Sequence, residues 1–167
     1  GDALSILDTS STIPSDIPIY LTGTVANQGN VSLPNATPEF FVLSNPLDLS
    51  AAQRTFYINN YESVLALAGV VSSTGGGITK TGQGSLYFTG TAHNTYIGDT
   101  LVNGGFLIAQ NSANIVAIPG NLLVNNGWAT MSRDNQLGSS SVVTLSSPNA
   151  FFDIETPHTT CKRLVME

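Results

Sequence analysis

The most motif-like polar cluster in the chain is Asn94-Thr95-Tyr96, which is followed by Gly98 and Thr100. A tyrosine ring beside a side-chain amide can bind a sugar. Asn and Thr at the corners of a repeating β-structure also form hydrogen bonds with the backbone and stack in ladders. We expect the second, structural role for this cluster.

Carboxylates form the next candidate site. Asp153 and Glu155 are two residues apart, which on a β-strand places both side chains on the same face. Such a pair can act as general acid and base in glycoside hydrolysis, but it can also simply solvate an exposed strand. No convergent group stands near the pair in the sequence, so we expect a solvated face. Asp99 and Asp134 are interpreted as isolated turn residues.

His93 and His158 are lone histidines. The chain lacks the sequence patterns of zinc proteases, nucleophile elbows, phosphate-binding loops and EF-hands, and also the calcium-binding nonapeptide. We therefore expect surface histidines, no catalytic residue, no metal site and no cofactor.

A tryptophan and two glycosylation sequons are candidate sites for binding or carrying a sugar. Trp128, the only tryptophan, follows Asn126-Gly127 and suits either a glycan-stacking platform or core packing, of which we expect packing. Asn30-Val31-Ser32 and Asn35-Ala36-Thr37 have the form of glycosylation sequons. These sequons matter only in a eukaryotic secretory pathway, and we interpret them as chance occurrences.

The composition excludes several classes of function. Only 10% of the 167 residues are charged and the formal net charge is −6, against about 25% charged residues in typical domains. The basic residues are Arg54, Lys80, Arg133, Lys162 and Arg163, of which only the last two are adjacent. Nucleic-acid binding needs clustered positive charge, so we exclude it.

A single cysteine, Cys161, rules out an internal disulfide and a cysteine-rich zinc site. We expect an inert thiol in a terminal segment. No apolar run is long enough for a membrane-spanning helix. The N-terminal residues also lack the pattern of a signal peptide, so we expect that a signal was removed or that the chain is a piece of a longer protein.

Apolar residues recur with a fixed period along the chain. Leu65, Leu86 and Leu107 are evenly spaced, and the same 21-residue offset, counted along the printed sequence, relates Leu67 to Phe88 and Leu122 to Val143. Fixed periods of about 20–50 residues are typical of repeat architectures, in which each unit buries its apolar face against the next. The period predicts one coil of a β-solenoid.

Short apolar runs bounded by Gly, Pro and Asn predict the strands. We expect strands at residues 17–22, 40–43, 55–58, 64–71, 85–89, 105–109, 121–125, 141–145 and 150–154. Single helical turns are expected near residues 3–7 and 50–54. The predicted organisation is an N-terminal arm at 1–16, a β-helix domain at 17–156 and a C-terminal extension at 157–167.

The segment from Leu65 to Ala109 resembles the autotransporter-associated β-strand repeat, also called the passenger-associated transport repeat. The matching residues are Gly76, Gly77, Thr79, Lys80, Gly82, Gly84, Leu86, Gly90, Asn94, Thr95, Tyr96, Gly98, Thr100, Val102, Gly105 and Leu107. Downstream, Asn135-Gln136-Leu137-Gly138 is similar to the coil that commonly follows. The resemblance implies a right-handed parallel β-helix that belongs to the secreted passenger of a bacterial surface protein.

We therefore expect an all-β, non-enzymatic stalk or adhesin that is extracellular or on the outer cell surface, with a glycan or a protein receptor as its partner. The alternative is an extracellular filament subunit that polymerises end to end through its end coils and the arm at 1–16. A polysaccharide-acting β-helix enzyme ranks last, because only three basic residues, Arg54, Lys80 and Arg133, precede position 162.

Overall fold

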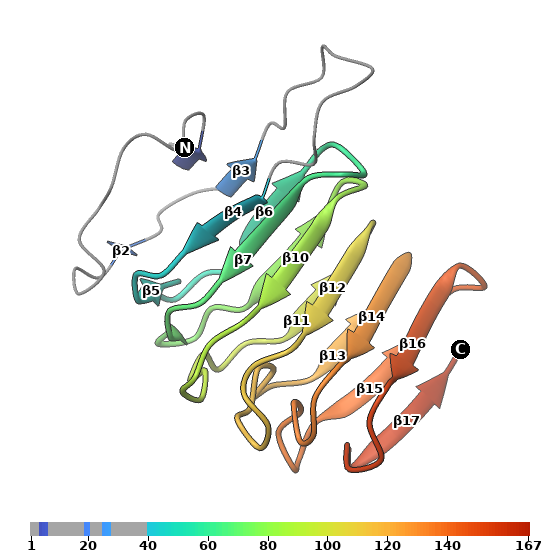
Figure 1. Ribbon diagram of the computed structural model, residues 1–167. Coiled ribbons are helices and arrows are strands. Elements are labelled where there is room, and N and C mark those ends of the chain that lie inside the picture. Colours follow the sequence, from blue (N-terminus) through green and yellow to red (C-terminus); the bar gives the residue numbers. More distant parts are fainter. Residues whose placement is uncertain (1–3, 7–18, 21–24, 28–39) are drawn as a thin grey trace.

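The computed structural model describes residues 4–6, 19–20, 25–27 and 40–167, and all the regular secondary structure in these residues is β (Figure 1). The first of three parallel sheets has eight strands, in the order β1 (Leu4–Ile6), β3 (Val25–Asn27), β6 (Arg54–Ile58), β9 (Ile78–Thr81), β11 (Thr100–Val102), β13 (Leu122–Val124), β15 (Val142–Leu145) and β17 (Arg163–Met166).

The second sheet has six strands, in the order β16 (Ala150–Ile154), β14 (Gly127–Met131), β12 (Phe106–Ala109), β10 (Ser85–Phe88), β7 (Val64–Leu67) and β4 (Phe40–Leu43). A third sheet has three short strands, β2 (Ile19–Tyr20), β5 (Leu47–Asp48) and β8 (Val71–Ser72). The chain passes from sheet to sheet and returns one strand further along, which makes a β-solenoid of about six turns. The predicted all-β parallel β-helix is confirmed.

Strand pairing follows the sequence period. Leu86 of β10 pairs with Leu65 of β7 on one side and with Leu107 of β12 on the other. Leu122 of β13 pairs with Val143 of β15. The coils differ in length, however, because the paired residues Arg54 and Ile78 lie further apart in the sequence than Leu65 and Leu86 do.

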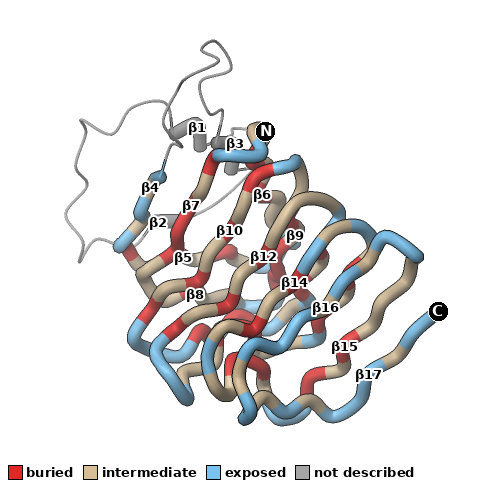
Figure 2. The backbone as a smooth tube through the Cα atoms, turned by 45° about the vertical axis from the view of Figure 1, so that its right-hand side comes forward, coloured by how far each residue is buried: buried red, intermediate tan, exposed pale blue. Residues whose placement is uncertain are grey.

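The core consists of columns of apolar side chains that run along the solenoid. Leu65, Leu86, Leu107 and Ala129 form one such column and are almost completely buried. Figure 2 shows the buried residues following one another from strand to strand. Because side chains alternate across a strand, every second residue enters the core, and each buried Leu, Val, Ile or Phe contributes about 1.5–3 kcal/mol.

The structure differs from the sequence-based expectation in several elements. Residues 4–6, where we expected a helical turn, form β1, and residues 50–54 form a turn that leads into β6. The strands β3, β5, β9, β11 and β14 were not expected. All of these except β14 have short or Thr-rich sequences with a weak apolar signal, and pairing with neighbouring coils supplies the stabilisation that such sequences lack alone.

The expected C-terminal extension at 157–167 contributes β17, which pairs in parallel with β15 through the partners Val143 and Leu164. The stacking therefore continues past residue 156. At the other end, the structure describes only residues 4–6 of the expected arm at 1–16, and both sequons, at Asn30 and Asn35, lie outside the described residues.

Candidate functional site

A row of aromatic side chains crosses the outer face of the six-stranded sheet. Phe106 of β12 pairs with Trp128 of β14, and Trp128 pairs with Phe151 of β16. Paired residues of parallel strands lie on the same face, about 4.8 Å apart, so the three rings line up along the solenoid axis. Tyr61, in the turn before β7, extends the row at its other end.

The rings contact one another in stacked, tilted and edge-on pairs. Trp128 and Phe151 are stacked, with centroids 4.5 Å apart and an interplanar angle of 19°. The other neighbour of Trp128 is Phe106, at 6.4 Å and 34°. Tyr61 meets Phe106 edge on, at 5.7 Å and 75°. Pairs of this kind contribute about 0.5–1.5 kcal/mol beyond their buried area. We call these four residues the aromatic row.

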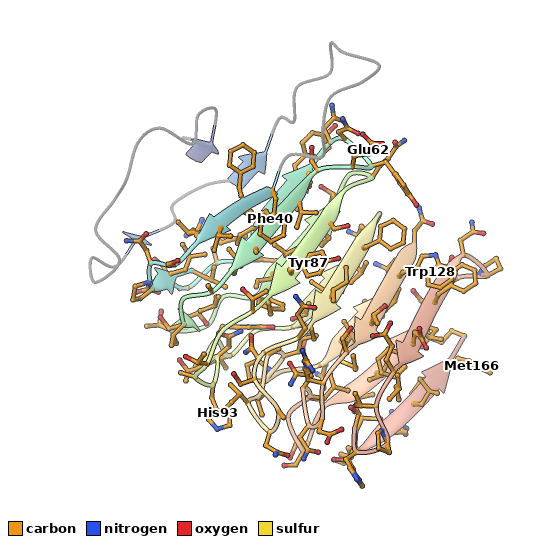
Figure 3. All side chains as sticks on the ribbon, in the orientation of Figure 1. Phe40, Glu62, Tyr87, His93, Trp128 and Met166 are labelled. Atoms are coloured by element: carbon orange, nitrogen blue, oxygen red, sulfur yellow. The ribbon has the colours of Figure 1, made fainter. Side chains whose placement is uncertain are left out.

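The aromatic row faces solvent. Trp128 is 42% exposed, Phe151 43% and Tyr61 65%, and Figure 3 shows Trp128 on the outside of the sheet. The neighbouring Ala129 is completely buried. The expectation that Trp128 packs in the core is therefore wrong, because the strand alternation directs Ala129 inward and Trp128 outward.

More apolar side chains lie beside the row. Tyr87 pairs with Ile108 in the next column of the same outer face, and both are partly exposed. Phe40 and Val42 of β4 are 56% and 54% exposed at the end of this sheet. The charged residue in these two outward columns is Asp153, on the last strand. The sheet thus presents a weakly charged, aromatic outer face.

Within the Asn94-Thr95-Tyr96 cluster, Asn94 and Tyr96 turn inward at a corner of the solenoid, whereas Thr95 is exposed. The Asn94 Oδ1 accepts a hydrogen bond from the Val71 N–H at 2.9 Å, and Nδ2 donates to the Ala117 carbonyl at 2.8 Å. Tyr96 is buried, and its hydroxyl lies 2.7 Å from Thr100 Oγ1. Burial raises the pKa of Tyr96 above its ordinary value, although the hydrogen bond with Thr100 lowers it. The two Asn94 hydrogen bonds join neighbouring coils, as the structural role predicts, and the Tyr96–Thr100 contact lies within one coil.

Lys80 is completely buried, which sequence reasoning missed. It occupies a core column between Phe56 and Val102, and its Nζ donates to the carbonyls of Thr81, Gly82 and Gly104 at 2.7, 3.0 and 3.1 Å. Burial lowers the pKa of Lys80 to about 7. The alternation Ile78-Thr79-Lys80 carried the signal, because it places Lys80 on the same strand face as Ile78.

A second buried amide stands at a corner of the solenoid. Gln136 has no exposed surface, and its Nε2 donates to the carbonyls of Asn111 and Asp134 at 3.3 and 3.1 Å. The Gln136 Oε1 and the buried Asp134 Oδ1 have no hydrogen-bond partner among the described residues. Asp134 was expected to be an isolated turn residue, and its carbonyl also accepts a hydrogen bond from the Asn114 N–H of the coil before it.

The remaining candidates are exposed. Asp153 and Glu155 are both exposed, as a solvated strand predicts. Asp99 is exposed too, and its Oδ1 accepts a hydrogen bond from Asn121 at 3.0 Å. His93 and His158 lie on the surface, and His93 Nδ1 accepts a hydrogen bond from the Val116 N–H at 2.9 Å.

Cys161, the single cysteine, is half-buried against the core. Among the described residues, no three His, Cys, Asp or Glu side chains form a group that could hold a metal ion, and no helix is long and apolar enough to cross a membrane.

Comparison with protein-family models, with curated proteins and with solved structures finds no match to this chain.

Proposed function

We propose that the chain is a non-enzymatic segment of a secreted or surface-attached β-helix, a stalk or adhesin of the autotransporter passenger type. The aromatic row on the six-stranded sheet is its contact surface. The exposure of Trp128, Phe151 and Tyr61 in one line is the observation that carries this proposal. Trp and Tyr are the side chains most enriched at the centres of protein interfaces.

The size of this surface supports a role in contact. At about 4.8 Å per strand the row is about 20 Å long. With the Tyr87 and Ile108 column beside it, the row forms a contiguous apolar strip. Apolar patches of a few hundred Å² on soluble proteins often mark interaction sites.

The ring geometry favours a protein receptor over a glycan. A sugar ring stacks on the open face of an aromatic ring, but Trp128 has Phe151 against one side and Phe106 toward the other. The Trp128 ring therefore presents mainly its edge to the solvent. Edges of this kind suit an apolar protein surface that has hydrogen-bond acceptors at its margin.

A strip this narrow predicts weak binding by one copy. Stable protein interfaces bury about 1,200–2,000 Å² in total, from about 20–30 residues a side, whereas the aromatic row has four residues. Adhesion would then depend on many copies acting together on one surface, which raises the overall affinity without new contacts.

The test uses beads that carry many copies of the chain, exposed to panels of immobilised extracellular proteins and of glycans. A double variant, Trp128→Ser with Phe151→Ser, removes the centre of the row. The matched control, Leu101→Ser with Leu123→Ser, changes two paired outward residues on the eight-stranded sheet. We expect protein targets that bind the wild type and the control but not the row variant. Binding to glycans, or equal binding by all three proteins, would contradict the proposal.

A filament subunit is the second candidate. In the part of the chain that the structure describes, β4 and β16 are the edge strands of the six-stranded sheet. An open edge offers backbone hydrogen bonds to another chain. Electron microscopy of the purified chain distinguishes the two functions, because a filament subunit gives regular polymers and a stalk segment gives short, separate particles.

A further inference from the structure

Two Asn-Gly dipeptides lie at the turns between the eight-stranded and the six-stranded sheet. Asn103-Gly104 follows β11, and Asn126-Gly127 leads into β14. Both asparagines are exposed. The backbone nitrogen of the next residue can attack an asparagine side chain, and glycine favours this attack because it has no Cβ to hinder the approach. The two turns therefore place the same reactive dipeptide in two different settings.

The backbone nitrogens of the two glycines differ in their hydrogen bonds. The Gly127 N–H donates to the Asn149 carbonyl of the next coil at 2.9 Å. For the Gly104 N–H, the described part of the chain offers no hydrogen-bond partner. The attacking nitrogen has to lose its proton and turn toward the side chain, so a hydrogen bond to a buried or half-buried carbonyl opposes the reaction. This bond protects Asn126 and leaves Asn103 unprotected.

The Asn103 side chain is also activated by a neighbour. Its Oδ1 accepts a hydrogen bond from Asn125 Nδ2 at 2.7 Å. A donor on the amide oxygen polarises the C–O bond and makes Cγ a better target for a nucleophile. The bond lies at the surface, where water competes for both amides, so it restrains rotation of the Asn103 side chain only weakly.

We propose that Asn103 is a site of spontaneous covalent modification, at which the folded chain converts asparagine into aspartate and isoaspartate. The Gly104 nitrogen gives its proton to water and forms a bond to Asn103 Cγ. The bond between Cγ and Nδ2 then breaks, and Nδ2 leaves as ammonia after taking up a proton from water. Water adds to one of the two carbonyls of the resulting succinimide ring and opens it. Nothing is oxidised or reduced, and the inference does not depend on the adhesive function.

The products change a turn that contacts the previous coil. The Asn103 N–H donates to the Lys80 carbonyl, and the Gly104 carbonyl accepts a hydrogen bond from Lys80 Nζ at 3.1 Å. In isoaspartate the backbone runs through the side chain, so one more carbon separates residue 103 from Gly104. We expect the longer link to displace the Gly104 carbonyl from Lys80. Each event also adds one negative charge to a chain whose net charge is −6.

Peptide mapping of the aged protein tests the site. The folded chain is kept at body temperature and neutral pH for several weeks, then unfolded and cut with trypsin. Because no basic residue lies between Lys80 and Arg133, the peptide 81–133 carries both dipeptides, and fragmentation assigns the small mass gain to one asparagine. We expect Asn103 to react at least tenfold faster than Asn126. The isolated peptide, kept in the same buffer, is the matched control and should react at both sites at similar rates.

Two variants separate the sites in the intact chain. Ion-exchange chromatography should show a more acidic species that accumulates in the wild type and in Asn126→Gln but not in Asn103→Gln, because glutamine would have to close a larger ring. Circular dichroism checks that both variants are folded. Equal rates at the two sites in the folded chain would overturn the proposal. So would a folded chain that leaves Asn103 intact while the isolated peptide reacts.

Discussion

The Lys80 Nζ donates a hydrogen bond to the Gly104 carbonyl at 3.1 Å and thereby ties the turn after β9 to the corresponding turn one coil further on. The same amine also holds the carbonyls of Thr81 and Gly82 in its own coil. A cation in a column between Phe56 and Val102 is costly to bury, and its three carbonyl partners offset part of that cost.

Because of Lys80, the free energy of unfolding should rise with pH near and above neutrality. Its pKa is about 7 in the folded chain, against 10.5 for the free side chain. Between these values the unfolded chain binds more protons than the folded chain, so the free energy of unfolding rises with pH. From about pH 6 to about pH 9 we expect urea denaturation to report a gain of about 2–3 kcal/mol. Lys80→Met should remove this gain, and an equal gain in that variant would contradict the assignment.

Asn94→Ala should be strongly destabilising. The substitution leaves the buried Val71 N–H without a partner and removes the amide donor to the Ala117 carbonyl, which keeps the Tyr96 hydroxyl at 3.5 Å. A loss of about 1–3 kcal/mol is expected, mainly for the unsatisfied Val71 N–H. The control is Thr95→Ala, because Thr95 is exposed and its backbone N–H bond to Val71 is kept. A loss equal to that of the control would mean that Asn94 does not join the coils.

Trp128 reports the aromatic row directly, because it is the only tryptophan in the chain. Phe151→Ala removes the ring that stacks on it at 4.5 Å. We expect the fluorescence emission to shift to longer wavelength and the free energy of unfolding to fall by about 1–2 kcal/mol. Phe40→Ala, an exposed aromatic at the other end of the same sheet, should leave the emission unchanged.

Gly82→Ala should disturb the turn that Lys80 holds. Gly82 has φ +78°, and an added Cβ would collide with the Ile58 carbonyl of the previous coil. Only glycine adopts this conformation without strain, so we expect a loss of about 2–4 kcal/mol. At Gly75 the nearest atom would be 3.6 Å from the new Cβ, so Gly75→Ala should fold normally. Thermal denaturation of both variants measures the difference.

The sequence predicts this fold well where coils have equal length. Leu65, Leu86 and Leu107 are evenly spaced and pair as their spacing predicts. A fixed period does not predict the aromatic row. The coils that hold Phe106, Trp128 and Phe151 are not of equal length, so the period does not align these three residues. A search that allows one or two extra residues in each coil would align them.

Burial of single residues was harder to predict than the fold. Trp128 is apolar but lies outside, and Lys80 is charged but lies inside. In each case the alternation along the strand decides the side, and this outweighs the preference of the residue type. The sequence predicts an extension at residues 157–167, whereas Arg163–Met166 form β17, because pairing with β15 stabilises a strand that its own short sequence does not indicate.

The strands lie across the solenoid, so their hydrogen bonds run along its length from coil to coil. A pull along this axis would therefore act directly on these bonds, and every coil would carry the same force. Coils with a neighbour on one side only would be released before those between two neighbours. If the solenoid were loaded in this way, it would lengthen one coil at a time while the remaining coils stay folded.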